Sequence, residues 1–357
     1  MTKTKFIFIL CLIGIALVSC SNVKNKGITK KNTNDLEIPD SLKINDGPYV
    51  FIKNEVLIEK SIVSGKVTKK FMPLTAYDIK FKAEASVYKD VEHIVALSDI
   101  HGQFDLAIEI LKNNKVIDNN LNWSFGKGHF VIVGDVFDRG PKVTETLWFI
   151  YNLEKQAEKS GGKVHFLLGN HEYMVIHNDL RYIHDKYAKA SQLLKTPYNE
   201  LFNNETVLGR WLRSKATLIK INDNMFVHGG VSPDFLSETF NIDNTNQVMR
   251  ESLDRDKKEM KAGPFYKRYY GKTGPIWYRG YFNDNLEESV IDDVLAKVDA
   301  NHFVVGHCSQ EQVLQLYNKK IFAVDSSIKN GVYGEVLFIN LNAYSRGKKT
   351  GEQIKLD

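Results

Sequence analysis

The sequence predicts an α/β fold in which helices pack on layered β-sheets. From residue 91 onward, apolar runs of four or five residues alternate with segments of helical periodicity, which is the pattern of such folds. Of the 357 residues, 43% are hydrophobic and 25% are charged. This composition is sufficient for a sizeable core, and it excludes a disordered, collagen-like or coiled-coil chain.

The first twenty residues have the pattern of an export signal. Lys3 and Lys5 precede thirteen apolar or small residues at 6–18, too few to span a bilayer comfortably. The junction 17–20 ends in Cys20 and resembles the lipobox of bacterial lipoproteins, in which the cysteine receives lipid and becomes the first residue. The alternative is a buried N-terminal element that contains an incidental cysteine.

We therefore expect residues 1–19 to be a signal peptide and Cys20 to carry lipid. Residues 20–45 include a polar stretch rich in Lys, Asn and Thr, which suits a solvated tether. This arrangement predicts an exported bacterial lipoprotein, anchored to a membrane through Cys20 and facing the periplasm or the cell surface.

Residues 46–90 are predicted to form a β-rich N-terminal extension. The β-rich stretches 49–52, 56–58 and 61–63 are separated by turn-forming and charged residues. We expect hairpins that pack on the main domain, and we find no functional motif in them.

The main domain is expected at residues 91–345. Apolar positions on one helical face predict helices at 104–116 and 144–159. Residues 173–216 are mostly helical by composition and interrupt the alternation, which predicts a helical cap insertion over a site.

The C-terminal part is predicted to contain antiparallel strands. The runs 321–324 and 334–341 flank the turn residues Asn330-Gly331, which favours pairing between them. We expect residues 346–357 to be a frayed tail.

Five apolar runs share a feature at their carboxyl ends, because each terminates in Asp, Asn or His beside a glycine. Ligands bind outside the carboxyl ends of the strands in open α/β sheets, so we expect these loops to converge. Glycine beside each cluster allows sharp turns and close backbone approach. The five endings are Asp99-Ile100-His101-Gly102, Gly134-Asp135-Val136-Phe137-Asp138-Arg139-Gly140, Gly169-Asn170-His171-Glu172, His228-Gly229-Gly230 and Gly306-His307.

The side chains in these endings predict an open metal site. They offer carboxylate, amide and imidazole ligands, with no repeated cysteine pattern. Such ligands suit divalent manganese, iron, zinc or magnesium rather than a closed structural zinc site.

The five endings, in this order, resemble the signatures of the calcineurin-like metallophosphoesterases, in the phosphoprotein phosphatase branch. The stretches 208–212 (Leu-Gly-Arg-Trp-Leu) and 274–280 (Gly-Pro-Ile-Trp-Tyr-Arg-Gly) are similar to those of bacterial, Shewanella-like protein phosphatases. The resemblance covers residues 91–341. It implies a layered β-sandwich flanked by helices. One departure is Ser98, where the family's first motif usually opens with glycine.

The resemblance also implies roles for individual residues. A first metal would be held by Asp99, His101 and Asp135. A second would be held by Asp135, Asn170, His228 and His307, with Asp135 bridging the two ions. Manganese is our first expectation for both ions, with iron, zinc or magnesium as alternatives.

The implied reaction is hydrolysis of a phosphomonoester by a hydroxide that bridges the two metals. His171 would protonate the leaving oxygen as general acid, and Asp138 would orient its imidazole. Arg139 and Arg279 would bind the phosphate oxygens.

Substrate class stays open between three readings. The first is a phosphatase acting on phosphoproteins, phosphopeptides or small phosphoesters. The second is a nucleotide hydrolase of the diadenosine tetraphosphatase type, which resembles this branch in the same five motifs. The third is a non-catalytic binding lipoprotein. Physiological substrate, phosphotyrosine versus phosphoserine or phosphothreonine, membrane leaflet and oligomeric state are not decided by the sequence.

Nucleic acid is not expected as a partner. The formal charge of +5 comes from 48 basic and 43 acidic residues, which are interspersed along the chain. A nucleic-acid binder would gather its basic residues on one face or in one run.

Overall fold

The computed structural model describes residues 44–237 and 239–356. The expected signal peptide, the expected lipidation site at Cys20 and nearly all of the expected tether lie outside the described residues. No helix in the described ranges is long and apolar enough to cross a membrane.

One six-stranded sheet carries the first three endings. Its order is β15-β14-β13-β5-β6-β7. Strands β5, β6 and β7 are parallel, β13 is antiparallel to β5, and β14 and β15 continue the antiparallel edge. The bounds are β5 (His93–Leu97), β6 (His129–Ile132), β7 (Lys163–Phe166), β13 (Glu335–Asn340), β14 (Ala343–Lys348) and β15 (Gln353–Lys355).

A second six-stranded sheet carries the other two endings. Its order is β11-β12-β10-β9-β8-β4, and β9, β10 and β12 are parallel to one another. The bounds are β4 (Val87–Tyr88), β8 (Leu218–Ile221), β9 (Asn224–Val227), β10 (His302–Val305), β11 (Leu314–Leu316) and β12 (Ile321–Ala323).

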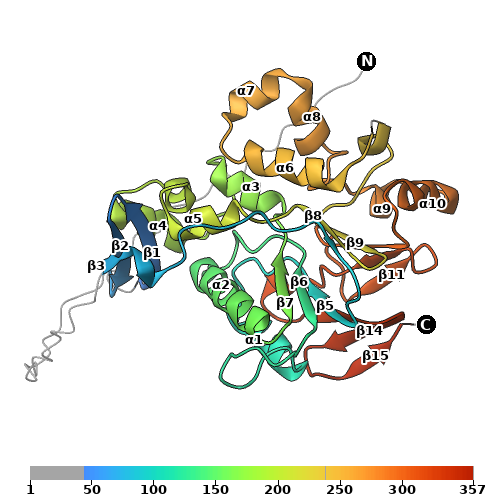
Figure 1. The fold of residues 1–357 in the computed structure, drawn as a ribbon, viewed down its shortest axis with the longest axis horizontal. Helices are drawn as coiled ribbons and strands as arrows, with labels where there is room; N and C mark the ends of the chain where they lie inside the picture. Colours follow the sequence, from blue (N-terminus) through green and yellow to red (C-terminus); the bar gives the residue numbers. More distant parts are fainter. Residues whose placement is uncertain (1–43, 238, 357) are drawn as a thin grey trace, which may run out of the picture. The chain divides into compact units, whose positions relative to one another are not determined.

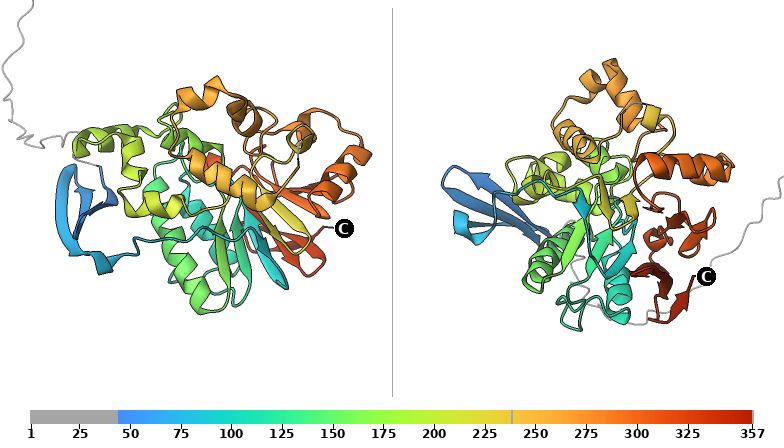
Figure 2. Two further views of the ribbon diagram at one scale, coloured as in Figure 1. Left: turned by 45° about the horizontal axis from the view of Figure 1, so that its top comes forward. Right: turned by 45° about the vertical axis from the view of Figure 1, so that its right-hand side comes forward.

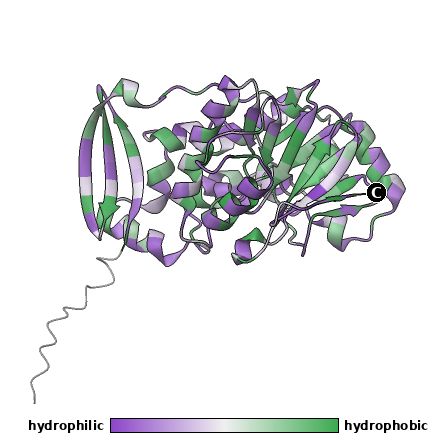
Figure 3. Cartoon of the chain, turned by 90° about the horizontal axis from the view of Figure 1, so that it is seen from below, coloured by the Kyte–Doolittle hydropathy of each residue, from purple (hydrophilic) through white to green (hydrophobic). Residues whose placement is uncertain are grey.

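The two sheets form a sandwich whose central strands are buried on both faces. Along β5, Ile94 and Ala96 pack with Phe226 and Val304 of the other sheet, whereas Val95 and Leu97 belong to the cluster that includes the helices. Strands buried on both faces are apolar at successive positions, which is why the sequence shows runs rather than alternation. Figure 3 shows this hydrophobic colouring along the strands of the body. The expected layered fold flanked by helices is confirmed.

Helices cover the sandwich and one end of it. Helices α1 (Phe104–Asn113) and α2 (Val143–Lys159) match the predicted ones closely. The 173–216 segment is helical as expected, and residues 235–297 add a further helical group (Figures 1 and 2). The remaining bounds are α3 (Asn170–Ile176), α4 (Asp185–Leu194), α5 (Val207–Leu212), α6 (Ile242–Ser252), α7 (Lys257–Ala262), α8 (Pro264–Tyr270), α9 (Gly280–Asn283) and α10 (Glu288–Lys297), with 3₁₀ turns η2 (Leu74–Ala76), η3 (Tyr198–Phe202), η4 (Phe235–Ser237) and η5 (Ile328–Asn330).

The N-terminal extension is a three-stranded antiparallel meander, as the hairpin prediction requires. It consists of β1 (Asp46–Lys53), β2 (Val56–Val63) and β3 (Lys66–Pro73) and stands at one edge of the body, coloured blue in Figure 1. The buried Tyr49 hydroxyl lies 2.6 Å from Asp46 Oδ2 and 3.2 Å from Thr144 Oγ1 of α2, which attaches the meander to the body. Strand β4, expected within the extension, instead pairs with β8 of the second sheet.

Two expectations for the C-terminal part are wrong. The runs 321–324 and 334–341 do not pair, because β12 lies in the second sheet parallel to β10, while β13 lies in the first sheet between β5 and β14. The Asn330-Gly331 turn marks a chain reversal but does not select the partner strand. Residues 346–357 are not a frayed tail, since β14 extends to Lys348 and β15 pairs with it.

Candidate active site

The carboxyl ends of five parallel strands bring the polar endings together. Asp99, Asp135 and Asn170 follow β5, β6 and β7 of the first sheet, and His228 and His307 follow β9 and β10 of the second. These five side chains are buried, with at most 8% of each residue exposed. The convergence expected from the sequence is therefore present.

The Asp135 carboxylate lies at the centre of the cluster. Its Oδ2 is 3.1 Å from His228 Nε2, 3.7 Å from His101 Nε2 and 3.8 Å from His171 Nε2. Although burial opposes a charge on His228, the Asp135 carboxylate raises the pKa of His228 to about 10. The buried carboxylate thus strongly favours positive charge beside it.

Two groups of buried side chains have the spacing needed to hold a metal ion. One comprises His101, Asp135 and His171, and the other Asp135, His228 and His307. Asp135 belongs to both, as a bridging ligand would. Asn170 lies beside the second group, because its Oδ1 is 2.9 Å from His228 Nε2.

His307 fits the expected ion well. Burial, His228 and Arg279 lower the pKa of His307 to about 3, so its imidazole is neutral and keeps a lone pair for coordination. Its Nε2 is buried without a hydrogen-bond partner. An unpartnered imidazole nitrogen that lies near a carboxylate and a second imidazole is suited to bind a cation.

Backbone carbonyls fix the orientation of two other imidazoles. His101 Nδ1 lies 2.6 Å from the Phe137 carbonyl oxygen, and His228 Nδ1 lies 2.7 Å from the Val133 carbonyl oxygen. With Nδ1 bound as the donor, Nε2 of each ring is directed toward Asp135. Such outer contacts set the tautomer of metal-binding histidines.

Ser98 is accommodated where the family usually has glycine. Its hydroxyl lies 2.6 Å from Asp99 Oδ2 and 2.8 Å from the Val133 carbonyl oxygen. Asp99 Oδ2 also accepts the His307 backbone N–H at 3.0 Å. The serine therefore adds a contact to a predicted ligand, and the neighbouring Gly306 leaves room for it, because a Cβ there would lie 2.1 Å from Ser98 Oγ.

Glu172 holds the loop that carries Asp135. Its carboxylate accepts backbone N–H groups of Asp135 at 2.9 Å, Val136 at 2.7 Å, Phe137 at 3.1 Å and Gly169 at 2.7 Å. Burial and the Asp135 carboxylate raise the pKa of Glu172 to about 7, against the opposing effect of these donors. Glu172 therefore supports the loop through hydrogen bonds and does not belong to either metal-binding group.

Several site residues adopt left-handed backbone conformations. Asp99, His101, Asp135 and His307 have φ between 47° and 66°, and Asp138 has φ 71°. Each such residue costs of order 1–3 kcal/mol unless its surroundings compensate. Strain gathered at one point of a fold is typical of a functional site.

His171 is paired with Asp138. Its Nδ1 lies 2.5 Å from Asp138 Oδ2, and its ring is nearly fully buried. Burial opposes the imidazolium, but the carboxylates of Asp135 and Asp138 raise the pKa of His171 above its ordinary value. The pair can therefore hold a proton near the cluster.

Two exposed guanidinium groups stand at the edge of the cluster. Arg139 Nε is 3.4 Å from His101 Nε2. Arg279 is close enough to lower the pKa of His307, and its guanidinium carbon lies 5.8 Å from the ring centre of Trp277. All ten residues that the sequence assigned to catalysis, substrate or metal thus lie at or beside this site.

Sequence reasoning missed Asp325, a buried carboxyl directly after β12. Burial and the nearby Asp99 raise its pKa to about 8, and it accepts the Ser309 hydroxyl at 2.5 Å. The sequence contains a pattern that could have indicated Asp325, because 321–324 is a sixth apolar run and Asp325 follows it. The mistaken pairing of that run with 334–341 hid it, since only a parallel β12 directs Asp325 to this edge.

Tyr182 was also missed. Its ring lies 5.4 Å from the His171 ring and 5.4 Å from the Arg139 guanidinium carbon, with 42% of the residue exposed. An exposed aromatic surface beside the cluster is available to an aromatic ligand. No local pattern distinguishes this tyrosine from the other fifteen.

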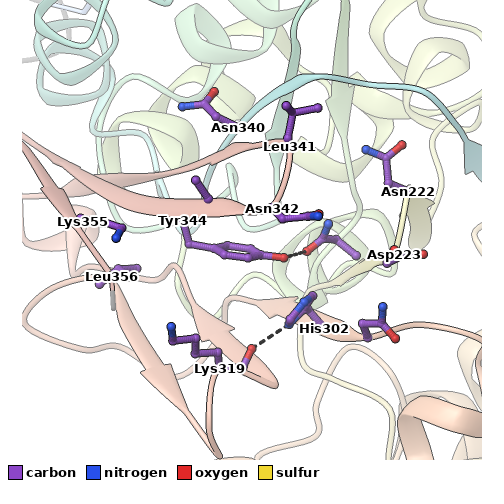
Figure 4. Close-up of a pocket in the computed structure, with 13 residues that line it drawn as sticks. Asn222, Asp223, His302, Lys319, Asn340, Leu341, Asn342, Tyr344, Lys355 and Leu356 are labelled. Atoms are coloured by element: carbon purple, nitrogen blue, oxygen red, sulfur yellow. Dashed lines mark hydrogen bonds between the residues drawn. The ribbon is translucent and has the colours of Figure 1, made fainter.

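A polar cavity of about 810 Å³ lies at the other end of the strands, away from the metal cluster (Figure 4). It is lined by Asn224 and His302, which begin the strands β9 and β10 that end near His228 and His307. It contains no member of either metal-binding group.

The comparisons with known proteins agree with the geometry. Residues 92–309 match the family described as calcineurin-like phosphoesterase. The chain is similar to the solved cold-active protein-tyrosine phosphatase of a psychrophilic Shewanella species, with 41% identity, a TM-score of 0.84, and coverage of 88% of this chain and 99% of that one. It is 27% identical to Shewanella-like protein phosphatase 1 of Plasmodium berghei, over 70% of this chain and 72% of the relative.

Similarity to nucleotide hydrolases is more limited. A symmetrical bis(5'-nucleosyl)-tetraphosphatase of Vibrio campbellii is 28% identical over 38% of this chain and 44% of its own length.

The Glu172 contacts generate a test. We expect Glu172→Gln to lower metal affinity about 10- to 100-fold, because an amide places a donor where backbone N–H groups need an acceptor. The free energy of unfolding should fall by about 1–3 kcal/mol for the same reason. Metal titration and denaturant unfolding measure both effects. Glu158→Gln, on the exposed face of α2, is the matched control, and wild-type metal affinity in Glu172→Gln would contradict the assigned role.

Proposed function

Because the chain belongs to the calcineurin-like phosphoesterase family and is a metal-dependent phosphatase, we propose that it acts on phosphoproteins and prefers phosphotyrosine. The observation that carries the proposal is the buried Asp135 cluster, with two exposed arginines and an exposed tyrosine at its edge. An exposed tyrosine ring beside the cluster suits an aryl phosphate on a protein surface.

The Shewanella protein supports the tyrosine preference. It is named a protein-tyrosine phosphatase, and the present chain matches nearly its whole length. Tyr182, beside His171, offers a ring against which a phosphotyrosine ring can pack.

We assign the first metal to Asp99, His101 and Asp135, and the second to Asp135, Asn170, His228 and His307, with manganese in both sites. Two divalent ions in such sites activate water and neutralise phosphate charge. The chain's own residues then decide how the phosphate and the proton are placed.

The phosphate group is oriented by Arg139 and Arg279. Both guanidinium groups are exposed beside the cluster, and their planar forks match phosphate oxygens. Their exposure leaves the N–H donors available to a ligand.

His171 delivers the proton to the leaving oxygen. Its Nδ1 is engaged by Asp138, so Nε2 is the atom that faces the cluster and can donate. The carboxylates of Asp135 and Asp138, which raise the pKa of His171 against the effect of burial, favour the protonated imidazole that a general acid requires. The spacing of His171 Nε2 also allows metal ligation, and the variant below separates the two roles.

The nucleotide hydrolase reading is the second candidate function. It shares the five motifs, but the similarity to the tetraphosphatases covers 38–54% of this chain, against 70% for Shewanella-like protein phosphatase 1. Hydrolysis of diadenosine tetraphosphate is therefore an outcome to test.

We also propose that the protein is exported and anchored through Cys20. The support is the sequence pattern of residues 1–20 alone. In that compartment, the enzyme would scavenge phosphate or would dephosphorylate envelope or host proteins.

The substrate proposal is tested by hydrolysis with protein comprising residue 21 onward, chelated and then resupplied with Mn²⁺. We expect turnover to return with the metal and to be higher on phosphotyrosine peptides than on matched phosphoserine and phosphothreonine peptides or diadenosine tetraphosphate. Asp135→Asn should abolish turnover, because it removes the shared ligand. Preference for the dinucleotide would favour the second candidate, and no turnover with two metals bound would favour a binding protein.

The proton-transfer assignment is tested with His171→Asn. We expect kcat on phosphopeptides to fall about 10²- to 10⁴-fold with metal content unchanged. The loss on p-nitrophenyl phosphate should be smaller, because that leaving group needs no proton. Loss of metal from the variant would instead make His171 a ligand.

Asp138→Asn extends the same test to pH. Asp138 raises the pKa of His171, so removing its charge lowers that pKa. Because the acid must be protonated, activity falls as pH rises through the pKa, and the alkaline limb of the kcat profile should move to lower pH. An unmoved limb would contradict the assignment.

Anchoring is tested with Cys20→Ala. We expect the wild-type chain to fractionate with membranes and to incorporate radiolabelled fatty acid, and the variant to do neither. A wild-type chain that stays unprocessed in the cytoplasm would overturn the localisation proposal.

A further inference from the structure

A cavity of about 540 Å³ lies outside the metal cluster, between the segment 79–83 and helices α5 and α6. Its volume is in the range of ligand pockets. Its lining is rich in basic side chains and includes Arg210, from the Leu-Gly-Arg-Trp-Leu stretch that the metal site does not use. The lining residues that carry charge are Lys80, Arg210, Arg213, Arg250 and Glu251.

Arg250 has a buried hydrogen-bond donor that is not satisfied. Its Nη1 is buried without a hydrogen-bond partner. Burial lowers the pKa of Arg250, against the raising effect of Tyr173, Glu84, Asp243 and Glu251 at longer range. A half-buried guanidinium that lacks a close carboxylate is costly to hold in place.

Arg210 is held by carbonyl oxygens only. Its Nε donates to Asn204 O at 2.7 Å and its Nη1 to Ile79 O at 3.1 Å. These bonds fix the guanidinium without neutralising it. Lys80 is exposed on the same cavity wall.

Three carboxylates beside the cavity are paired with other cations. Asp254 binds Arg213 at 2.7 Å. Glu251 lies 3.5 Å from Arg255, and Glu84 lies 3.0 Å from Lys215. The lining of the cavity itself carries four basic side chains and one acidic side chain.

The polar cavity in Figure 4 differs from the arginine cavity in the bonding and charge of its lining. Two of its amide side chains form hydrogen bonds within the protein. Asn224 Oδ1 accepts the Tyr344 hydroxyl at 3.1 Å, and Asn222 forms hydrogen bonds with the Val91 backbone. Its charged residues include both signs, Asp223 with Lys319 and Lys355. The arginine cavity has a larger excess of basic over acidic side chains in its lining.

We propose that the cavity formed by Lys80, Arg210 and Arg250 is a second, non-catalytic binding site for a phosphate-type oxyanion. A dianion balances three cations better than a single carboxylate does. Planar guanidinium forks match tetrahedral phosphate oxygens, and Phe81 and Ile79 give the cavity an apolar wall. The ligand is either free phosphate or a phosphoryl group carried by a peptide.

The site is tested by calorimetric titration of the full chain, in detergent at fixed ionic strength. The probe is inorganic phosphate, and the background is Asp135→Asn, which removes the shared metal ligand and leaves the arginine cavity intact. We expect one phosphate to bind in this background. Adding Arg250→Gln or, separately, Arg210→Gln should weaken binding at least about tenfold, and circular dichroism checks that each variant is folded.

Lys258→Gln is the matched control, because Lys258 on α7 is an exposed basic residue that does not line the cavity. It should leave the affinity within about twofold. A non-hydrolysed phosphoserine peptide then distinguishes the sources, since tighter binding than phosphate assigns the site to a peptide and equal binding assigns it to the free ion. Absence of phosphate binding in Asp135→Asn, or unchanged binding after both arginine substitutions, would overturn the proposal without affecting the catalytic assignment.

Discussion

The buried carboxylate of Asp135 is the constraint on which the rest of the site depends. A charge taken out of water costs several kcal/mol unless compensating charge surrounds it. Here the compensation comes from imidazoles on other loops, with His228 at 3.1 Å and His101 at 3.7 Å from one oxygen. A carboxylate in such a place favours a bound cation. The charge that is costly to bury during folding is therefore the same charge that attracts a metal ion.

The sandwich satisfies this constraint through its topology. Parallel β5, β6, β7, β9, β10 and β12 all deliver their carboxyl ends to one edge, from two sheets. Glu172 then locks two of the loops together by accepting four backbone N–H groups. Close approach requires glycine at one point in particular, since a Cβ at Gly169 would lie 2.3 Å from Asp135 Oδ1.

The helical segments have a separate part in function. Residues 173–216 contribute Tyr182 beside His171 on one side and Arg210 to a basic cavity on the other. The catalytic cluster is built from strand ends, whereas the features that distinguish substrates or additional ligands come from this insertion and from α6. Chemistry and recognition are thus carried by different parts of the chain.

Local sequence patterns predict the fold class, the two helices beside the first sheet, and the polar strand endings that meet around Asp135. These signals are local: doubly buried strands are apolar at successive positions, and each ending places its ligands within a few residues of a strand. Other features depend on the tertiary structure: which strands pair, that Asp325 lies near Asp99, that His171 is within metal-binding distance, and that Arg210 and Arg250 line one cavity. Those are contacts between residues far apart in sequence, and they depend on how the layers pack, which no local pattern encodes.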